Sequence, residues 1–229
     1  GELVSAFESR DFEQTAYLAR ELLIDEGPKH TQIQRIYLHA LCECDDFASV
    51  ISYSAKDESL KAYHAYGLYK KQQFANALDV AQSCDELPAK LIVAQSLYRL
   101  DRSDEAVKAF LDLVDSLEDV EERMQVWTNI VSVESSHTVP YCGEQRPDLV
   151  EKVTSFLQNH AQLDPYDLAY TLATWQLLIN PSERPKYLDL LKNASEQCKY
   201  INTDLPDDDL AAELVPIVTN LDVFQRAFW

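Results

Sequence analysis

Three tyrosines recur at every third position of the segment LKAYHAYGLYKK, which spans residues 60–71. On a helix, Tyr63, Tyr66 and Tyr69 would lie along one side, with Lys70 beside them. Tyrosine provides a large contact area at low entropic cost and offers a hydroxyl to a partner's main chain. This pattern indicates non-covalent recognition of another polypeptide. The alternative is that the rings, Tyr63 above all, pack between neighbouring helices as core.

Comparable residues occupy matching positions in neighbouring segments. They are Arg35 and His39 before the tyrosines, Leu91, Gln95, Tyr98 and Arg99 after them, and then Thr128, Asn129 and Ser132. A short helix or an extended peptide could lie across such a surface, with its apolar side chains between the rings and its main chain bonded to Gln95 and Asn129. For His39, an ordinary interior or surface histidine is the competing interpretation.

The residue types that usually carry catalysis or bind metals form no pattern in this chain. The five histidines are scattered, with no glycine-rich phosphate loop and no serine nucleophile motif. The five cysteines have no regular spacing, and Cys42 and Cys44 would point to different faces of a helix. We expect reduced thiols that bind no metal. The sequence therefore predicts neither an enzyme nor a cofactor site.

The net charge of −19, from 39 acidic and 20 basic residues, bears on the class of partner. So acidic a chain should repel a polyphosphate backbone, and we expect no direct RNA or DNA binding. The excess acid is either a solvated outer face or, in part, a surface that steers a basic partner segment into a groove. No apolar stretch reaches the roughly 18 residues of a membrane span. We therefore expect no membrane insertion and a cytoplasmic location.

An internal repeat in the sequence predicts the helices that would position these residues. Two copies place marker residues at offsets of nine and twelve: Ala65, Phe74 and Ala77, then, twenty-nine positions later, Ala94, Ser103 and Ala106. Small residues at such points let two antiparallel helices approach closely, and no single pair can bury its apolar face alone. Apolar residues recur every three or four positions almost throughout. The sequence predicts an all-α fold, a right-handed superhelix (α-solenoid) of tetratricopeptide-like helix hairpins.

We name the first helix of each hairpin its A helix and the second its B helix. Early A helices are expected at residues 3–9 and 32–43, and early B helices at 13–24 and 48–53. The phenylalanines at 12, 47 and 74, which mark the turns before the B helices, follow one another after thirty-five and twenty-seven positions. Later helices are expected at 120–136 and 149–161, on either side of an irregular loop at 137–148. Residues 1–229 would form a single domain of about six repeats plus an unpaired C-terminal helix.

Several segments carry a more specific resemblance. The stretch LYRLDRSDEA at residues 97–106 leads into EERMQVWTN at 121–129, and LKAYHAYGLYKKQQFANALDVAQS precedes both. In this order and spacing they resemble the N-terminal tetratricopeptide-repeat domain of the seventy-two-kilodalton subunit of the signal recognition particle. The resemblance implies a scaffold whose groove holds the C-terminal segment of the particle's sixty-eight-kilodalton subunit. It implies a role in co-translational targeting to the endoplasmic reticulum, with particle assembly passing through the nucleolus. In that family a separate lysine-rich region contacts the RNA.

Two other functions stay open. One is a co-chaperone-type repeat domain that clamps an acidic C-terminal peptide, which needs a concave face rich in lysine and asparagine. The corresponding positions here are Arg35, Ala62, Leu91 and Thr128, with one base among four. The other is a generic scaffold in which the tyrosine surface joins two copies of the chain.

Overall fold

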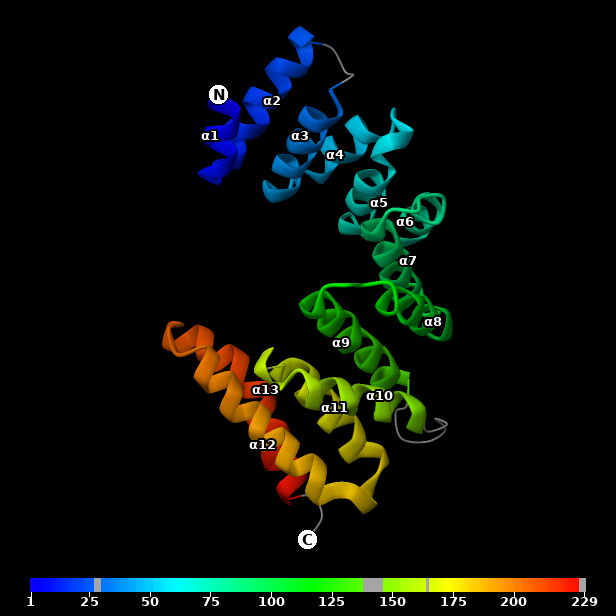
Figure 1. The fold of residues 1–229 in the computed structure, drawn as a ribbon, viewed down its shortest axis with the longest axis vertical. Helices are drawn as coiled ribbons and strands as arrows, with labels where there is room; N and C mark the ends of the chain where they lie inside the picture. The colour runs from blue at the N-terminus through cyan, green and yellow to red at the C-terminus, as the bar shows by residue number, and fades with distance from the viewer. Residues whose placement is uncertain (27–29, 138–145, 164, 227–229) are drawn as a thin grey trace. The chain divides into compact units, whose positions relative to one another are not determined.

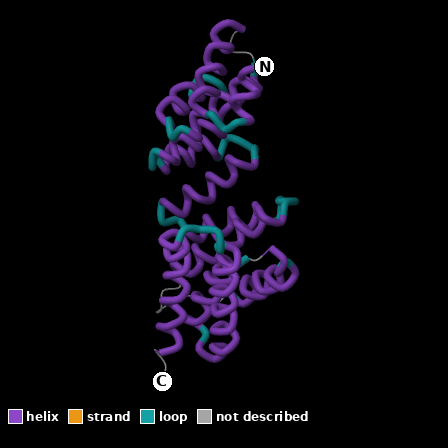
Figure 2. The backbone as a smooth tube through the Cα atoms, turned by 90° about the vertical axis from the view of Figure 1, so that its left-hand side faces the viewer, coloured by secondary structure: helices purple, strands orange, loops and turns teal. Residues whose placement is uncertain are grey.

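The computed structural model describes residues 1–26, 30–137, 146–163 and 165–226. Within these ranges all regular structure is helical, with thirteen α-helices, three short 3-10 helices and no strand. Figure 1 follows the helices in chain order, and Figure 2 shows helices joined by loops throughout the described residues. The prediction of an all-α fold is confirmed. The chain divides into two compact units, Gly1–Ala109 and Phe110–Trp229, and each is described by itself.

Four helix hairpins follow one another from the N-terminus, and the last helix, α8, begins in the first unit and ends in the second. The helices are α1 (Glu2–Glu8), α2 (Phe12–Glu26), α3 (Thr31–Glu43), α4 (Phe47–Ser54), α5 (Lys61–Lys70), α6 (Phe74–Ala81), α7 (Leu87–Arg99) and α8 (Ser103–Val114), with a short 3-10 helix η1 (Glu58–Leu60) before α5. Consecutive helices pack on each other, as α2 does on α3 and α5 does on both α4 and α6. Odd-numbered helices are the A helices of these hairpins, and even-numbered helices are the B helices.

One turn conformation joins the A helix to the B helix in all four hairpins. The residue two positions before each B helix has a positive φ, between 56° and 60°: Arg10, Asp45, Gln72 and Asp101. In each case the next amide bonds back five residues, as Gln73 N–H does to the Leu68 carbonyl over 2.9 Å. A left-handed residue of this kind closes a helix by satisfying its last carbonyls. We call these four the left-handed turn residues, and the intervals between their positions match the predicted repeat.

The small residues predicted to let the helices approach are fully buried. Ala65, Ala77, Ala94 and Ala106 each have no exposed surface. Gly67 in α5 marks a still closer approach, because a Cβ atom there would come within 2.9 Å of the Ile51 side chain and 3.2 Å of Val50 in α4. Helix packing in this unit therefore depends on residues without side-chain bulk at the contact points.

Five α-helices lie in the second unit after α8. They are α9 (Val120–His137), α10 (Pro147–Asn159), α11 (Tyr166–Ile179), α12 (Arg184–Ile201) and α13 (Asp207–Arg226), with 3-10 helices η2 (Ala161–Leu163) and η3 (Pro181–Glu183). Helix α11 packs on α9 and α12, and α12 packs on α13. The core joins Ala173, Tyr187 and Leu191 to Ile217 and Phe224, so the last helix is held by its buried side chains.

The helix bounds on either side of the predicted loop differ slightly from the sequence expectation. The sequence predicts an irregular loop at 137–148, but α9 continues to His137 and α10 already begins at Pro147, because proline fits the first turn of a helix. Residues 138–145 lie outside the described residues. No left-handed turn residue occurs in the described part of this unit, and α11 connects to α12 through η3 instead.

Among the described residues, no helix combines the length and apolarity that crossing a bilayer requires.

Candidate functional site

Ten of the thirteen candidate residues lie on three A helices of the first unit. Arg35 and His39 belong to α3, the three tyrosines and Lys70 to α5, and Leu91, Gln95, Tyr98 and Arg99 to α7. Thr128, Asn129 and Ser132 lie on α9 in the second unit. The structure thus brings together the candidates of the first unit alone.

Tyr66 and Tyr98 are the exposed tyrosines of this set. Each keeps 37% of its surface open to solvent, while Tyr63 and Tyr69 are half-buried. Arg35, Lys70 and Arg99 are exposed as well. An exposed large aromatic side chain beside exposed bases is available for contact with another molecule.

A phenylalanine opens the B helix of each of the first three hairpins and contacts the A helix of the next hairpin. The ring of Phe12 lies 5.8 Å from His39, and the ring of Phe47 lies 5.9 Å from Tyr66. The guanidinium of Arg99 lies 4.9 Å from the centre of Phe74. We call these contacts the hairpin junctions. They show that His39, Tyr66 and Arg99 each have a packing role.

Lys70 belongs to the junction at Phe47, and Tyr69 packs on Phe74 within its own hairpin. The ammonium of Lys70 lies 5.3 Å from the centre of the Phe47 ring and 5.9 Å from that of Tyr66. The ring of Tyr69 meets Phe74 edge-on at 5.4 Å. Cation–π contacts of this kind contribute about 0.5–1 kcal/mol at exposed sites. They hold the charged groups over the rings while leaving them accessible.

Tyr63 has the packing role that the sequence left open as an alternative. Its ring lies against the core cluster of Leu38 and Leu60, and its hydroxyl donates to the Arg35 carbonyl at 3.5 Å. Burial raises the pKa of the Tyr63 phenol. The side chain of Arg35 in turn lies 3.7 Å from Glu86, the residue before α7. These contacts connect α3 to α5 and to the start of α7.

The candidates on α9 have their polar groups engaged locally. The Thr128 hydroxyl donates to the Met124 carbonyl at 2.9 Å, and the Ser132 hydroxyl donates to the Thr128 carbonyl at 2.7 Å. Thr128 and Asn129 also line a hollow of about 460 Å³ together with Tyr166 and Asp167. Burial raises the pKa of the Asp167 carboxyl. Because each hydroxyl already donates its proton to the preceding turn, it can only accept a hydrogen bond from a partner.

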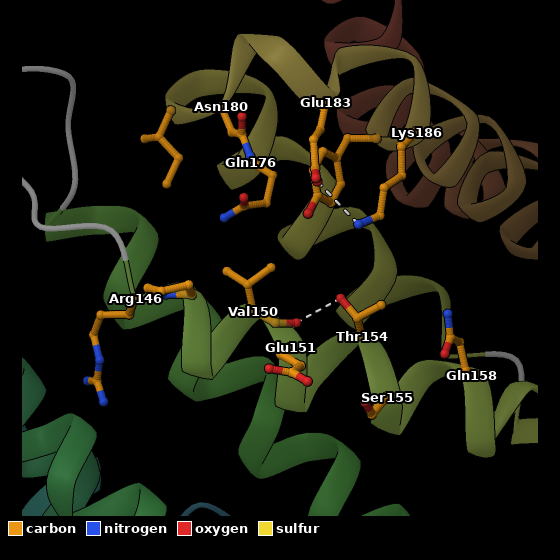
Figure 3. A pocket seen from close by; sticks show the side chains of 13 residues that line it. Arg146, Val150, Glu151, Thr154, Ser155, Gln158, Gln176, Asn180, Glu183 and Lys186 are labelled. Atoms are coloured by element: carbon orange, nitrogen blue, oxygen red, sulfur yellow. Dashed lines mark hydrogen bonds and ion pairs between the residues drawn. The ribbon is translucent and has the colours of Figure 1, made fainter.

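A second hollow, of about 390 Å³, lies between α10 and the α11–α12 connection, and no sequence prediction covers it. Figure 3 shows Val150 of α10 pointing toward Gln176 of α11, with Lys186 and Glu183 paired at 3.2 Å on the far side. Gln176 is 3% exposed, and its Nε2 donates no hydrogen bond within the described residues. The sequence carries no signal for this hollow, because it depends on how α10 packs on α11.

One serine–histidine pair can be compared with an activated nucleophile. The His64 ring nitrogen Nδ1 lies 3.2 Å from the Ser54 hydroxyl and 3.2 Å from the Ile51 carbonyl. The Ser54 hydroxyl donates to the Val50 carbonyl, one turn back in its own helix. Its proton is therefore directed at the backbone, whereas an activated nucleophile would direct it at a base. This pair ties α5 to α4.

Comparison with known proteins gives no relative: no family model matches the chain, and a search of curated proteins finds no match.

Proposed function

We propose that this chain is a protein-binding scaffold that holds a segment of another polypeptide against the A helices α3, α5 and α7. The observation that carries the proposal is the matching exposure of Tyr66 and Tyr98 on the neighbouring A helices α5 and α7. In tetratricopeptide-type arrays the A helices line the concave side of a right-handed superhelix, and we propose the same for the hairpins of the first unit. A partner segment lying across them would meet the two rings, and Gln95, one turn before Tyr98 on α7, would supply a side-chain amide for its main chain.

The particular scaffold we propose is that of the signal recognition particle. The support is the sequence resemblance of residues 60–136 to the repeat domain of the particle's seventy-two-kilodalton subunit, and the regular structure of these residues is helical, as in such a domain. The partner is then the C-terminal segment of the sixty-eight-kilodalton subunit, and the role is co-translational targeting to the endoplasmic reticulum from the cytoplasm. RNA contact belongs to a different region of such a protein, in keeping with the acidity of this chain.

The test is capture of the sixty-eight-kilodalton subunit's C-terminal segment by a chain carrying Tyr66→Ala and Tyr98→Ala. Central interface tyrosines contribute about 1–3 kcal/mol each, so the double variant should bind about thirtyfold more weakly or worse and lose capture in a pull-down. The matched control is Tyr17→Ala with Tyr200→Ala, which removes two tyrosines that are 59% and 77% exposed on α2 and α12. The control should capture normally.

Folding of the variants needs its own check, because the Tyr66 ring packs on Phe47. Circular dichroism and thermal unfolding should show a folded double variant with a somewhat lower Tm. Tyr66→Phe with Tyr98→Phe keeps both rings and should retain most of the capture, since the rings provide most of the contact area. Undiminished capture by the folded double alanine variant would remove the A-helix surface from the proposal.

A further inference from the structure

Basic residues gather on the A helices of an otherwise acidic chain. Helices α3, α5 and α7 contain five Lys or Arg residues and one acid, Glu43, although the whole chain has a net charge of −19. The B helices α2 and α8 show the opposite balance, with four and three acids against one base each. Basic residues are therefore concentrated on the three A helices that carry the candidate surface, whereas the first A helix, α1, has two acids and no base.

Two of these bases keep an accessible charge at the candidate surface. Arg35 lies 3.7 Å from Glu86, and Lys61 lies 2.5 Å from Glu58. Lys70 and Arg99, at the last turns of α5 and α7, are exposed and form no ion pair with a carboxylate in the described ranges. They rest on the Phe47 and Phe74 rings next to Tyr66 and Tyr69.

The local charge of this surface, and not the net charge of the chain, decides what docks there. Exposed charges farther apart than about 8 Å are largely screened at physiological ionic strength. Acids also lie near these two bases: burial raises the pKa of Tyr66 and the charges of Glu43 and Asp45 raise it further, while the exposed Asp101 follows Arg99 by two residues. A partner's acidic groups would pair with Lys70 and Arg99 themselves, because both are exposed and no carboxylate of the described residues pairs with them.

We propose that the polypeptide segment held by this surface is acidic, with carboxylates paired to Lys70 and Arg99 and an apolar or aromatic side chain against Tyr66 and Tyr98. This inference rests on the proposed peptide-binding function and runs against one alternative that the sequence left open, in which acidic residues steer a basic partner into the groove. An RNA strand is less suited to this surface, because its phosphates would continue beyond Lys70 and Arg99 into the acidic surroundings, where they are repelled.

The experiment measures the binding of two labelled twelve-residue peptides. Both contain four leucines at the same positions; the charged positions are all glutamate in one peptide and all lysine in the other. The glutamate peptide should bind the unmodified chain more tightly than the lysine peptide, and its affinity should fall as salt is raised. Lys70→Gln with Arg99→Gln should raise its Kd about tenfold at low salt, the sum of two exposed charge pairs.

Two controls separate charge from packing. Lys56→Gln with Lys108→Gln makes the same change in net charge at exposed positions outside the A helices and should leave the Kd unchanged. Lys70→Arg with Arg99→Lys keeps both charges over the rings and should bind like the unmodified chain. An unchanged Kd for Lys70→Gln with Arg99→Gln, or tighter binding of the lysine peptide, would overturn the inference.

The outcomes also separate this inference from the proposed function. If the tyrosine double variant loses the sixty-eight-kilodalton subunit's segment while the glutamine variant binds the glutamate peptide normally, the scaffold function stands and the acidic partner does not. If the glutamate peptide binds through Lys70 and Arg99 but that segment is never captured, the acidic partner stands and the particle assignment falls. A twenty-nucleotide polyuridine strand that displaces the glutamate peptide at equal concentration would show that the surface takes RNA and overturn the inference.

Discussion

The left-handed turn residues concentrate backbone strain at four single positions. Asp45 and Asp101 are of a type that tolerates a positive φ, whereas Arg10 and Gln72 are not. A β-carbon in this region costs about 1–2 kcal/mol, and glycine avoids most of that penalty. The same turn is therefore held at all four positions by the packing of the helices on either side of it.

Gln72→Gly should stabilise the chain by about 0.5–1 kcal/mol, because relief of the β-carbon strain exceeds the added freedom that glycine has when unfolded. Urea unfolding measures the change. The control is Gln72→Ala, which removes the exposed side chain but keeps the β-carbon, and it should leave the stability nearly unchanged. Equal stabilisation by both variants would show that the side chain, and not the backbone, is strained.

At the same scale, the sequence predicted some candidate residues well and could not place others. The regular spacing of Tyr63, Tyr66 and Tyr69 placed them along one helix, but only the fold distinguishes the exposed Tyr66 from the half-buried Tyr63. Lys70 and Arg99 were predicted for contact with a partner, while their position over phenylalanine rings depends on neighbouring hairpins. A helical periodicity does not specify which ring a flexible base covers.

Among the elements, periodicity and spacing predicted the hairpins of the first unit closely. Helices expected at 32–43 and 48–53 are observed as α3 (Thr31–Glu43) and α4 (Phe47–Ser54). The hairpin junctions were not predicted, because each joins residues from two different hairpins. The hollow beside Gln176 was missed for the same reason, since no local pattern encodes how α10 meets α11.

The close approach of α5 to α4 gives a prediction at this scale. Gly67→Val adds three carbons at a position where a β-carbon alone would come within 2.9 Å of the Ile51 side chain and 3.2 Å of Val50. Overpacking of this kind should destabilise the chain by about 2 kcal/mol. Ala75→Val, at an exposed position of α6, adds a β-branched residue without crowding and should cost about 0.6 kcal/mol. Thermal unfolding of both variants compares the two effects, and equal losses would contradict the crowding at Gly67.

For the whole molecule, the distribution of charge bears on self-association. A scaffold that joined two copies face to face through the tyrosine surface would bring the exposed bases Lys70 and Arg99 of one copy against those of the other. Repulsion between them is strongest at low ionic strength.

We therefore expect a monomer in sedimentation velocity between about 5 and 200 µM at about 0.05 M salt, where screening is weak. The sedimentation coefficient should not rise with concentration. A concentration-dependent dimer that Tyr66→Ala with Tyr98→Ala abolishes would favour the self-associating scaffold, with a second copy in place of a foreign segment.

The hairpin junctions also bear on how the length of such a chain can vary. In each of the three junctions, the phenylalanine that opens a B helix contacts the A helix of the next hairpin. This holds although the left-handed turn residues Arg10, Asp45 and Gln72 are unevenly spaced along the chain. The difference in length is taken up between the first residue of one B helix and the A helix that follows it, without disturbing an aromatic contact. We expect insertions and deletions to be tolerated in the connections that follow the B helices, and a peptide tag placed between α4 and η1 should leave the recognition surface intact.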